Sequence, residues 1–277
     1  MRLQYLQEAI RFSPADYPSI MHDPRLRVGY EIEFIGIKDH YSVMLDKLAQ
    51  DLNLSVKWNP STKQVTGGMW GLVYDPSIEP DYPFREQGWE LISPPLPVEQ
   101  ALIHLKDIFG WIEANKYYTN NTCGFHVNVS YGDKTQKADP LKLILLLGEQ
   151  YLADLFQRAT NEFAASHIQE LKAKIRKNPQ IVVSADTDIN QLKKVLRKML
   201  SQEKKRTVNL GKLAEKGYLE FRIAGGAKYH TQYQRILDII LRYAFVVKAS
   251  LDPNSFKRAY AQELARLIMQ ARSTKEG

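Results

Sequence analysis

Four short segments of the chain alternate between apolar and polar side chains, and this alternation constrains the fold more than any other feature. The segments read VGYEIEF from residue 28, GWELIS from 88, GFHVNVS from 124 and YLEFRIA from 218. A period of two residues is typical of strands that bury one face. Because helical patterns surround these strands without a regular strand–helix–strand rhythm, the chain is predicted to form an α+β fold with a mostly antiparallel sheet.

The polar residues of each segment fall on the same side of its strand. In an extended chain, Glu31 and Glu33 would lie roughly 6 to 7 Å apart on one face. Without a cation between them, such carboxylates repel and raise each other's pKa. The four strands therefore predict one sheet with a chemical face, and this face would carry Glu31, Glu33, Glu90, His126, Asn128, Glu220 and Arg222.

These side chains suit a divalent cation. Carboxylate oxygens are the preferred ligands of Mg²⁺ and Mn²⁺, and imidazole is an acceptable one. Each residue alone also has a structural interpretation. The ExE pair could form a solvated acidic face, His126 could be a packing residue, and Glu220 and Arg222 could form an exposed ion pair worth less than about 1 kcal/mol.

Composition indicates a water-soluble globular protein, and we expect it in the cytoplasm. The chain has 277 residues and one cysteine, Cys123, which excludes an internal disulfide. Its longest apolar run, LKLILLLG from residue 141, is too short to span a bilayer. The net charge of +7 is concentrated between Lys172 and Lys216, a segment that contains thirteen Lys and Arg but only four Asp and Glu. Such a stretch can contact a polyanion, but on amphipathic helices it is more often a solvated face.

Helical periodicity predicts six helices around the strands. Asp139 and Pro140 resemble an N-cap and a first helical residue, and the helix they begin is expected to continue to about Lys177. The other predicted helices cover 42–53, a stretch that starts at Pro97, 188–205, 231–250 and 255–272.

Four ordered motifs resemble those of a known family. VGYEIEF, then WGLVYDPSIEP with GWELISPPL, then TCGFHVNVS, and finally VNLGKLAEKGYLEFRIAGG are similar to the motifs of the amidoligase family. That family belongs to the carboxylate-amine ligase superfamily, together with glutamine synthetase and glutamate-cysteine ligase. The resemblance covers roughly residues 27 to 230. It implies a single catalytic domain over 1–277, with a concave catalytic sheet face backed by helices as in glutamine synthetase and a helical, basic subregion at about 140–210.

The resemblance also implies roles for individual residues. Arg222 matches a phosphate-binding arginine, and Asn128 stands where the family usually has a second histidine, so it could bind a substrate oxygen but could not act as a base. Lys205 and Arg206 are further candidates for binding phosphate, and Asp75 or Glu79 for the base that activates the amine. The residues implied to bind metal are Glu31, Glu33, Glu90, His126 and Glu220.

The implied activity is an ATP- and Mg²⁺-dependent ligation of a carboxylate to an amine through an acyl phosphate, with Mn²⁺ as an alternative ion. The substrates would be small molecules or peptides, and the basic subregion suggests an acidic peptide or protein. We expect no membrane or nucleic-acid partner, and the oligomeric state is left open. Two alternatives stay open as well: a metal-dependent phosphotransferase or nuclease, and a relative that has lost catalysis and acts in binding.

Overall fold

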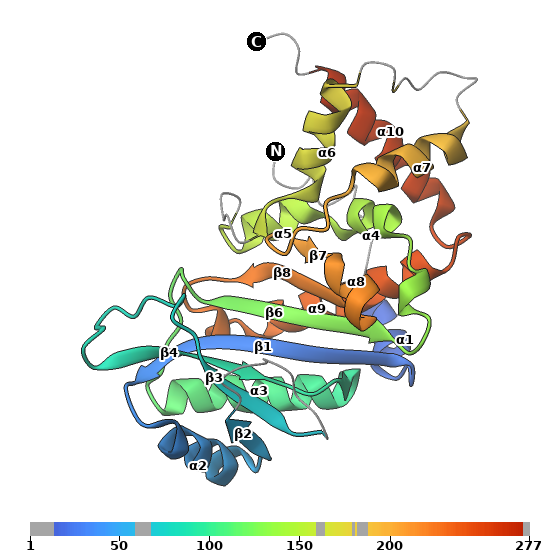
Figure 1. Cartoon of the computed structure of the whole chain (residues 1–277). Coiled ribbons are helices and arrows are strands. Elements are labelled where there is room, and N and C mark those ends of the chain that lie inside the picture. The colour runs from blue at the N-terminus through green and yellow to red at the C-terminus, as the bar shows by residue number, and fades with distance from the viewer. Residues whose placement is uncertain (1–13, 59–67, 159–163, 179–180, 182–187, 274–277) are drawn as a thin grey trace.

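An open, mostly antiparallel sheet backed by helices forms the centre of the protein (Figure 1). The computed structural model describes residues 14–58, 68–158, 164–178, 181 and 188–273. Within these ranges the sheet has the order β2-β3-β4-β1-β6-β8-β7, and β5 pairs with the start of β1. The β2–β3 pair is parallel and the other pairs are antiparallel. The strands are β1 (Leu26–Ile37), β2 (Val56–Trp58), β3 (Trp70–Tyr74), β4 (Glu86–Ile92), β5 (Leu96–Pro97), β6 (Gly124–Tyr131), β7 (Val208–Asn209) and β8 (Leu219–Gly225).

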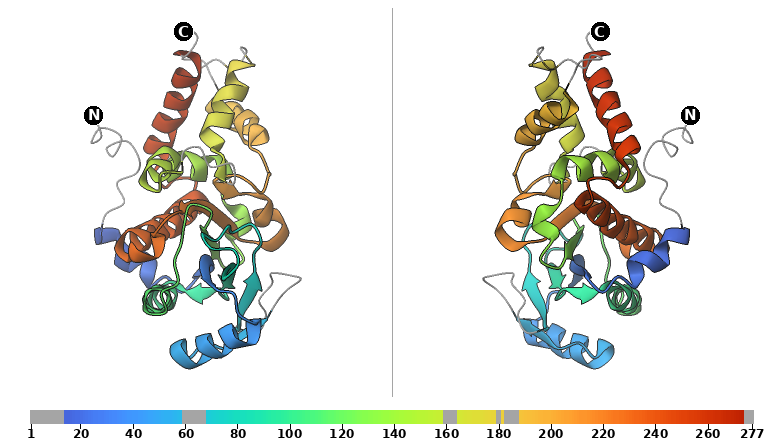
Figure 2. Two further views of the ribbon diagram at one scale, coloured as in Figure 1. Left: turned by 90° about the vertical axis from the view of Figure 1, so that its left-hand side faces the viewer. Right: turned by 90° about the vertical axis from the view of Figure 1, so that its right-hand side faces the viewer.

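The four segments with alternating side chains are β1, β4, β6 and β8, which are consecutive neighbours in the sheet. Their apolar residues point to the face that two long helices cover, α3 (Val98–Ala114) and α9 (Tyr233–Leu251). The Phe34 ring meets the edge of Trp111 at 5.9 Å, and Phe221 stacks on Tyr243 at 4.2 Å between ring centres. Figure 2 shows these helices along one side of the sheet. Burial of one face thus leaves the opposite face to the polar residues.

The remaining helices lie at the ends and edge of the sheet. Those that carry residues 140 to 199, together with α10, form a group beyond the β7–β8 edge (Figure 1), and their buried side chains join the same hydrophobic core as the sheet. The helices are α1 (Tyr17–Met21), α2 (Tyr41–Leu52), α4 (Pro140–Leu147), α5 (Glu149–Leu155), α6 (His167–Arg176), α7 (Ile189–Met199), α8 (Gly211–Lys216) and α10 (Lys257–Ser273).

The prediction of one long helix from Asp139 to about Lys177 is wrong, although its start is confirmed. Asp139 Oδ1 accepts the backbone N–H groups of residues 141 and 142, as an N-cap does. The chain then turns at Gly148, whose φ of 78° ends α4 because the left-handed conformation cannot continue a helix. A new cap at Ser166 begins α6, and residues 159–163 of the predicted helix lie outside the described residues.

The helix predicted over 188–205 is also too long. Helix α7 ends at Met199 because Leu200 has an extended backbone, with φ of −66° and ψ of 132°. The following residues then lead into the short strand β7, which pairs with β8. Among the helices of the described ranges, none combines the length and the apolar character that crossing a bilayer requires.

Candidate active site

Strand register brings the polar side chains of β1, β4, β6 and β8 together. Directly opposed residues in an antiparallel pair point to the same face of the sheet. The opposed pairs are Glu31 with His126, Glu33 with Glu90, and Asn128 with Glu220. We call the resulting set of Glu31, Glu33, Glu90, His126 and Glu220 the carboxylate cluster.

His126 lies at the centre of three carboxylates. Its Nδ1 atom is 3.0 Å from Glu31 Oε2 and 4.0 Å from Glu220 Oε1, and its Nε2 atom is 3.9 Å from Glu33 Oε1. One ligand atom each from Glu31, His126 and Glu220 lies within 4.8 Å of the other two. Three donors at this spacing can surround a single cation after small side-chain adjustments.

Glu33 is held by the backbone at the start of β6. Its Oε2 atom accepts the N–H of Gly124 at 2.6 Å. A Cβ atom on residue 124 would lie 2.7 Å from His126 Nε2 and 3.2 Å from both carboxylate oxygens of Glu33. A side chain at this position would therefore push His126 and Glu33 from their places in the carboxylate cluster, and glycine leaves both where they are.

Glu220 is fixed by two polar neighbours on its own side of the sheet. Its Oε2 atom accepts a hydrogen bond of 2.7 Å from Asn209 Nδ2, and Asn209 lies directly opposite in β7. Its Oε1 atom accepts a hydrogen bond from the guanidinium of Arg222, two residues along β8. Glu220 thus presents a preoriented carboxylate to His126.

Burial makes the charge of the carboxylate cluster costly. Glu90 and Glu220 are 1% exposed and Glu33 is 7% exposed. Burial would raise the pKa of Glu31, but the hydrogen bond and charge of His126 lower it to about 2. Burial opposes the charge on His126, yet the Glu31 hydrogen bond and the charges of Glu33 and Glu31 raise its pKa above the usual value. A cation bound among these carboxylates would offset their mutual repulsion.

The donor atoms fit a hard divalent cation. Carboxylate oxygens predominate, with one imidazole, which suits Mg²⁺ or Mn²⁺. Asn128 adds a further acceptor: its Nδ2 atom donates to Glu31 Oε1 at 3.3 Å, while its buried Oδ1 atom has no hydrogen-bond partner among the described residues. This orphaned oxygen next to Glu31 is available to a metal-bound water or to a substrate donor.

Three residues that the sequence suggested for this site have contacts outside the carboxylate cluster: Asp75, Arg206 and Lys205. Asp75 follows the end of β3, and its Oδ1 atom accepts hydrogen bonds from the backbone N–H and the hydroxyl of Ser77. Arg206 lies 3.4 Å from Glu170 and 2.8 Å from Glu203, between nitrogen and carboxylate oxygen.

Arg206 lies before the two-residue strand β7, and its backbone forms an isolated bridge with Ala165. Lys205 is held through its carbonyl, which accepts the N–H of Ala165.

Sequence analysis missed two polar residues around the carboxylate cluster. Asn209 belongs to the motif VNLGK, and its alternation with Val208 in a two-residue strand was too short to signal a face. Arg158 follows α5, far from the motifs, and no sequence pattern distinguishes it from other arginines. Its nearness to the cluster depends on how the chain returns after Gly148.

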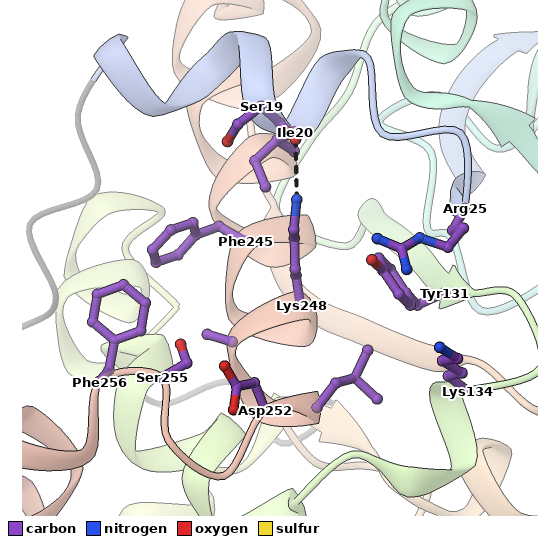
Figure 3. A pocket seen from close by; sticks show the side chains of 12 residues that line it. Ser19, Ile20, Arg25, Tyr131, Lys134, Phe245, Lys248, Asp252, Ser255 and Phe256 are labelled. Atoms are coloured by element: carbon purple, nitrogen blue, oxygen red, sulfur yellow. Dashed lines mark hydrogen bonds between the residues drawn. The ribbon is translucent and has the colours of Figure 1, made fainter.

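A cavity of about 400 Å³ lies elsewhere, between α1, the end of β6 and α9 (Figure 3). Its lining includes Arg25, Tyr131 and Lys248. Tyr131 belongs to the apolar set of β6, so the cavity is on the helix-covered side of the sheet. Lys248 and Arg25 both pair with Asp23, which offsets part of their positive charge. This cavity is therefore separate from the carboxylate cluster.

Comparison with known proteins assigns the family. The search of curated proteins finds no match to the chain. Residues 24–243 match the family model described as "Putative amidoligase enzyme", and this range contains every member of the carboxylate cluster. A match over most of the chain shows that the protein belongs to this amidoligase family.

Proposed function

We propose that the protein is an ATP- and Mg²⁺-dependent carboxylate-amine ligase, similar in its catalytic chemistry to glutamine synthetase. It would activate the carboxylate of an amino acid, peptide or protein as an acyl phosphate, which an amine then attacks. The observation that carries this proposal is the convergence of Glu31, His126 and Glu220, from three strands, within 4.8 Å. Family membership supports the ligase class.

The carboxylate cluster would hold the metal and, through it, the nucleotide. Glu31, Glu33, Glu90, His126 and Glu220 supply four carboxylates and one imidazole, a set suited to more than one Mg²⁺ or Mn²⁺ ion. Bound divalent ions neutralise the phosphates and favour in-line transfer of the γ-phosphoryl group. The protein contributes fixed ligand positions, since Gly124 holds Glu33 and Asn209 holds Glu220.

Arg222 would stabilise the phosphoryl group during transfer. Its guanidinium cannot lose its proton and lies against Glu220, in the carboxylate cluster. Asn128 would bind a substrate or phosphate-bound water through its free Oδ1 atom. Lys205 and Arg206 stay weaker candidates, because Arg206 would have to leave Glu170 and Glu203 to reach a phosphate.

The amine must lose a proton before or during its attack. Asp75 is the candidate base, and it would have to exchange its hydrogen bonds with Ser77 for one with the amine. Glu79 lies in the same loop, which is tied to the segment before β6 by Glu79 N–H to Thr122 and by Asn120 to the Glu79 carbonyl. This loop could exclude water from the activated acid.

Coupled ADP release tests the proposal. ADP and phosphate should form only when an acid, an amine, ATP and Mg²⁺ are all present, and Glu220→Ala should abolish their formation while the protein stays folded. Asp23→Asn is the matched control, because Asp23 is another buried carboxylate but accepts a hydrogen bond from Tyr131, on the other side of the sheet. ATP hydrolysis that ignores acid and amine, or metal-dependent cleavage of nucleic acid, would support the phosphotransferase or nuclease alternative.

The acid substrate could be an acidic peptide or protein tail. Several cations of the basic subregion already have partners: Lys174 lies 2.7 Å from Glu170, and Lys193 lies over the Tyr260 ring at 4.6 Å. The proposal therefore depends on the other lysines of α6 and α7. Equal ADP release with neutral and acidic peptides would overturn it, and the ligase proposal itself would be unaffected.

A further inference from the structure

Arg158 enters the site from a part of the chain that carries none of the family motifs. It follows helix α5, is only 7% exposed, and donates from a terminal nitrogen to the carbonyl of Cys123 at 2.9 Å. Cys123 directly precedes Gly124, whose N–H holds Glu33. The guanidinium therefore lies one residue from the backbone group that fixes a member of the carboxylate cluster.

The guanidinium of Arg158 is incompletely satisfied. Its buried Nε atom has no hydrogen-bond acceptor within the described part of the chain. Burial lowers the pKa of Arg158, Glu33 opposes this effect, and the positive charge of Arg222 adds to it. Arg158 thus interacts with both Glu33 and Arg222, yet shares no hydrogen bond with either. A buried cation with a free donor is costly unless an anion completes its environment.

One glycine makes room for this guanidinium. Gly225, at the end of β8, pairs with Gly124 of β6 and has a φ of 129°. A Cβ atom on residue 225 would lie 2.3 Å from a terminal nitrogen of Arg158 and 2.7 Å from the Cys123 carbonyl oxygen. Gly225 therefore leaves room for Arg158, while Gly124, directly opposite, leaves room for His126 and Glu33.

We propose that Arg158 is a second anion-binding residue of the site and that, with Arg222, it binds the oxygens of the phosphoryl group that is transferred. The proposal rests on the function proposed above. The positive charges of Arg158 and Arg222 oppose each other, and an anion with more than one negative charge and several acceptor oxygens is best suited to relieve this repulsion. A phosphoryl group has both properties, whereas a substrate carboxylate carries a single charge.

Calorimetric titration with two nucleotides tests this role. In Arg158→Gln, binding of the magnesium complex of a non-hydrolysable ATP analogue should weaken about tenfold or more, as expected for loss of charged hydrogen bonds. Binding of Mg·ADP, which lacks the γ-phosphoryl group, should change less than about threefold. If both nucleotides weaken equally, Arg158 acts only by holding the Cys123–Gly124 backbone; if neither weakens, it does not contact the nucleotide. Either result overturns the proposal.

Two variants separate anion binding from folding. Arg158→Lys keeps the charge and should retain part of the affinity for the ATP analogue. Arg242→Gln is the matched control, because the Nε atom of Arg242 also donates to a backbone carbonyl, that of Leu147 at 2.8 Å, but from α9 on the other side of the sheet. Arg242→Gln should lower stability but leave the ratio of affinities for the ATP analogue and for ADP unchanged. An equal change of this ratio in Arg158→Gln and Arg242→Gln would contradict the proposal.

A nucleotide-free measurement distinguishes failure of this inference from failure of the ligase proposal. Inorganic phosphate should raise the melting temperature of the wild-type protein and not that of Arg158→Gln, and acetate should have no such effect. If the wild type binds no nucleotide but keeps this phosphate response, the ligase proposal fails and the anion site stands. A response to acetate alone, or a phosphate response that survives Arg158→Gln, overturns the anion site.

Discussion

One buried acid and a cluster of buried acids lie on opposite sides of the same sheet. On the helix-covered side, Asp23 accepts hydrogen bonds from Tyr131 at 3.2 Å and from the backbone of Arg25 at 3.1 Å, and its other contacts are ion pairs with Arg25 and Lys248. On the polar side, four carboxylates from three strands share one face of the sheet with the imidazole of His126 and the guanidinium of Arg222.

The difference lies in charge balance. Asp23 is one acid with two cations, so its charge is compensated and its pKa falls to about 2 despite the opposing effect of burial. The carboxylate cluster has more acids than permanent cations, and its members are held in place by Gly124 and Asn209. A compensated acid stabilises the fold, whereas an excess of fixed acids is suited to binding a cation at the cost of stability.

Metal binding should show the largest contrast. Glu33→Gln keeps an oxygen for the Gly124 N–H but removes a charge, so we expect Mn²⁺ affinity to fall about 100-fold, the upper end of effects seen for groups that support a metal. Electron paramagnetic resonance of Mn²⁺ titrations would measure it. Asp23→Asn should bind Mn²⁺ as the wild type does, and equal loss in both variants would remove the distinction between the two sides.

Stability should show the reverse contrast. Asp23→Asn should lower the free energy of unfolding by about 1 to 2 kcal/mol at pH 7, a value that allows for solvent screening of its pKa shift. Because the folded pKa of Asp23 is depressed from 3.8 to about 2, this stabilisation is present above pH 4 and is lost as pH falls towards 2. Urea unfolding at several pH values would measure both effects.

The metal-free carboxylate cluster provides the comparison for this experiment. Glu33→Gln in a chelator should change the free energy of unfolding by less than about 1 kcal/mol, because relief of repulsion offsets the weaker hydrogen bond to Gly124. A large destabilisation by Glu33→Gln would mean that the carboxylates are structural.

The sequence was sufficient to predict the sheet face because strand alternation is a local property. Glu31 and Glu33 must share a face in any extended conformation, and their apolar neighbours select which face is buried. The prediction failed for the helix from Asp139, because Leu141 to Leu147 are buried all round and periodicity cannot show where such a run turns. The helix that ends at Gly148 packs against α9 and α10, which are distant in the sequence, so a local pattern does not include these contacts.

The candidate site was predictable only where it lies on strands. Its strand residues lie opposite one another in neighbouring strands, so the alternation within each strand indicated that their side chains would share one face. Arg158 reaches the site through the turn at Gly148 and the positive φ of Gln157, which no periodicity encodes. Arg206 stays a prediction, and its ion pairs with Glu170 and Glu203 could not be foreseen from local charge because Glu170 is 36 residues away in the sequence.

The pH dependence of metal binding should be a smaller effect. Because the pKa of His126 is raised above 6.5, its proton must be displaced by the metal at pH values below the raised pKa. Mn²⁺ affinity should therefore increase by up to about tenfold per pH unit as pH rises to that value, and then level off. His126→Gln should bind more weakly and with a shallower slope, while Asp23→Asn should keep the wild-type slope. An unchanged slope in His126→Gln would show that other groups release the proton.

The substitution Arg25→Gln should have the smallest effect on stability, and it tests which of the two cations compensates the charge of Asp23. Both its hydrogen bonds end on Asp23 Oδ1, yet its side chain is 54% exposed, whereas that of Lys248 is 36% exposed and lies 2.9 Å from Asp23 Oδ2. The backbone N–H of Arg25 survives substitution, so Arg25→Gln removes only a solvent-screened ion pair and the guanidinium over the Tyr131 ring, 4.5 Å from its centre. We expect a loss of less than about 1 kcal/mol by urea unfolding. A loss as large as that of Asp23→Asn would mean that Arg25, rather than Lys248 and Tyr131, compensates the negative charge of Asp23. Solvent-exposed cations could then compensate the charge of the carboxylate cluster equally well.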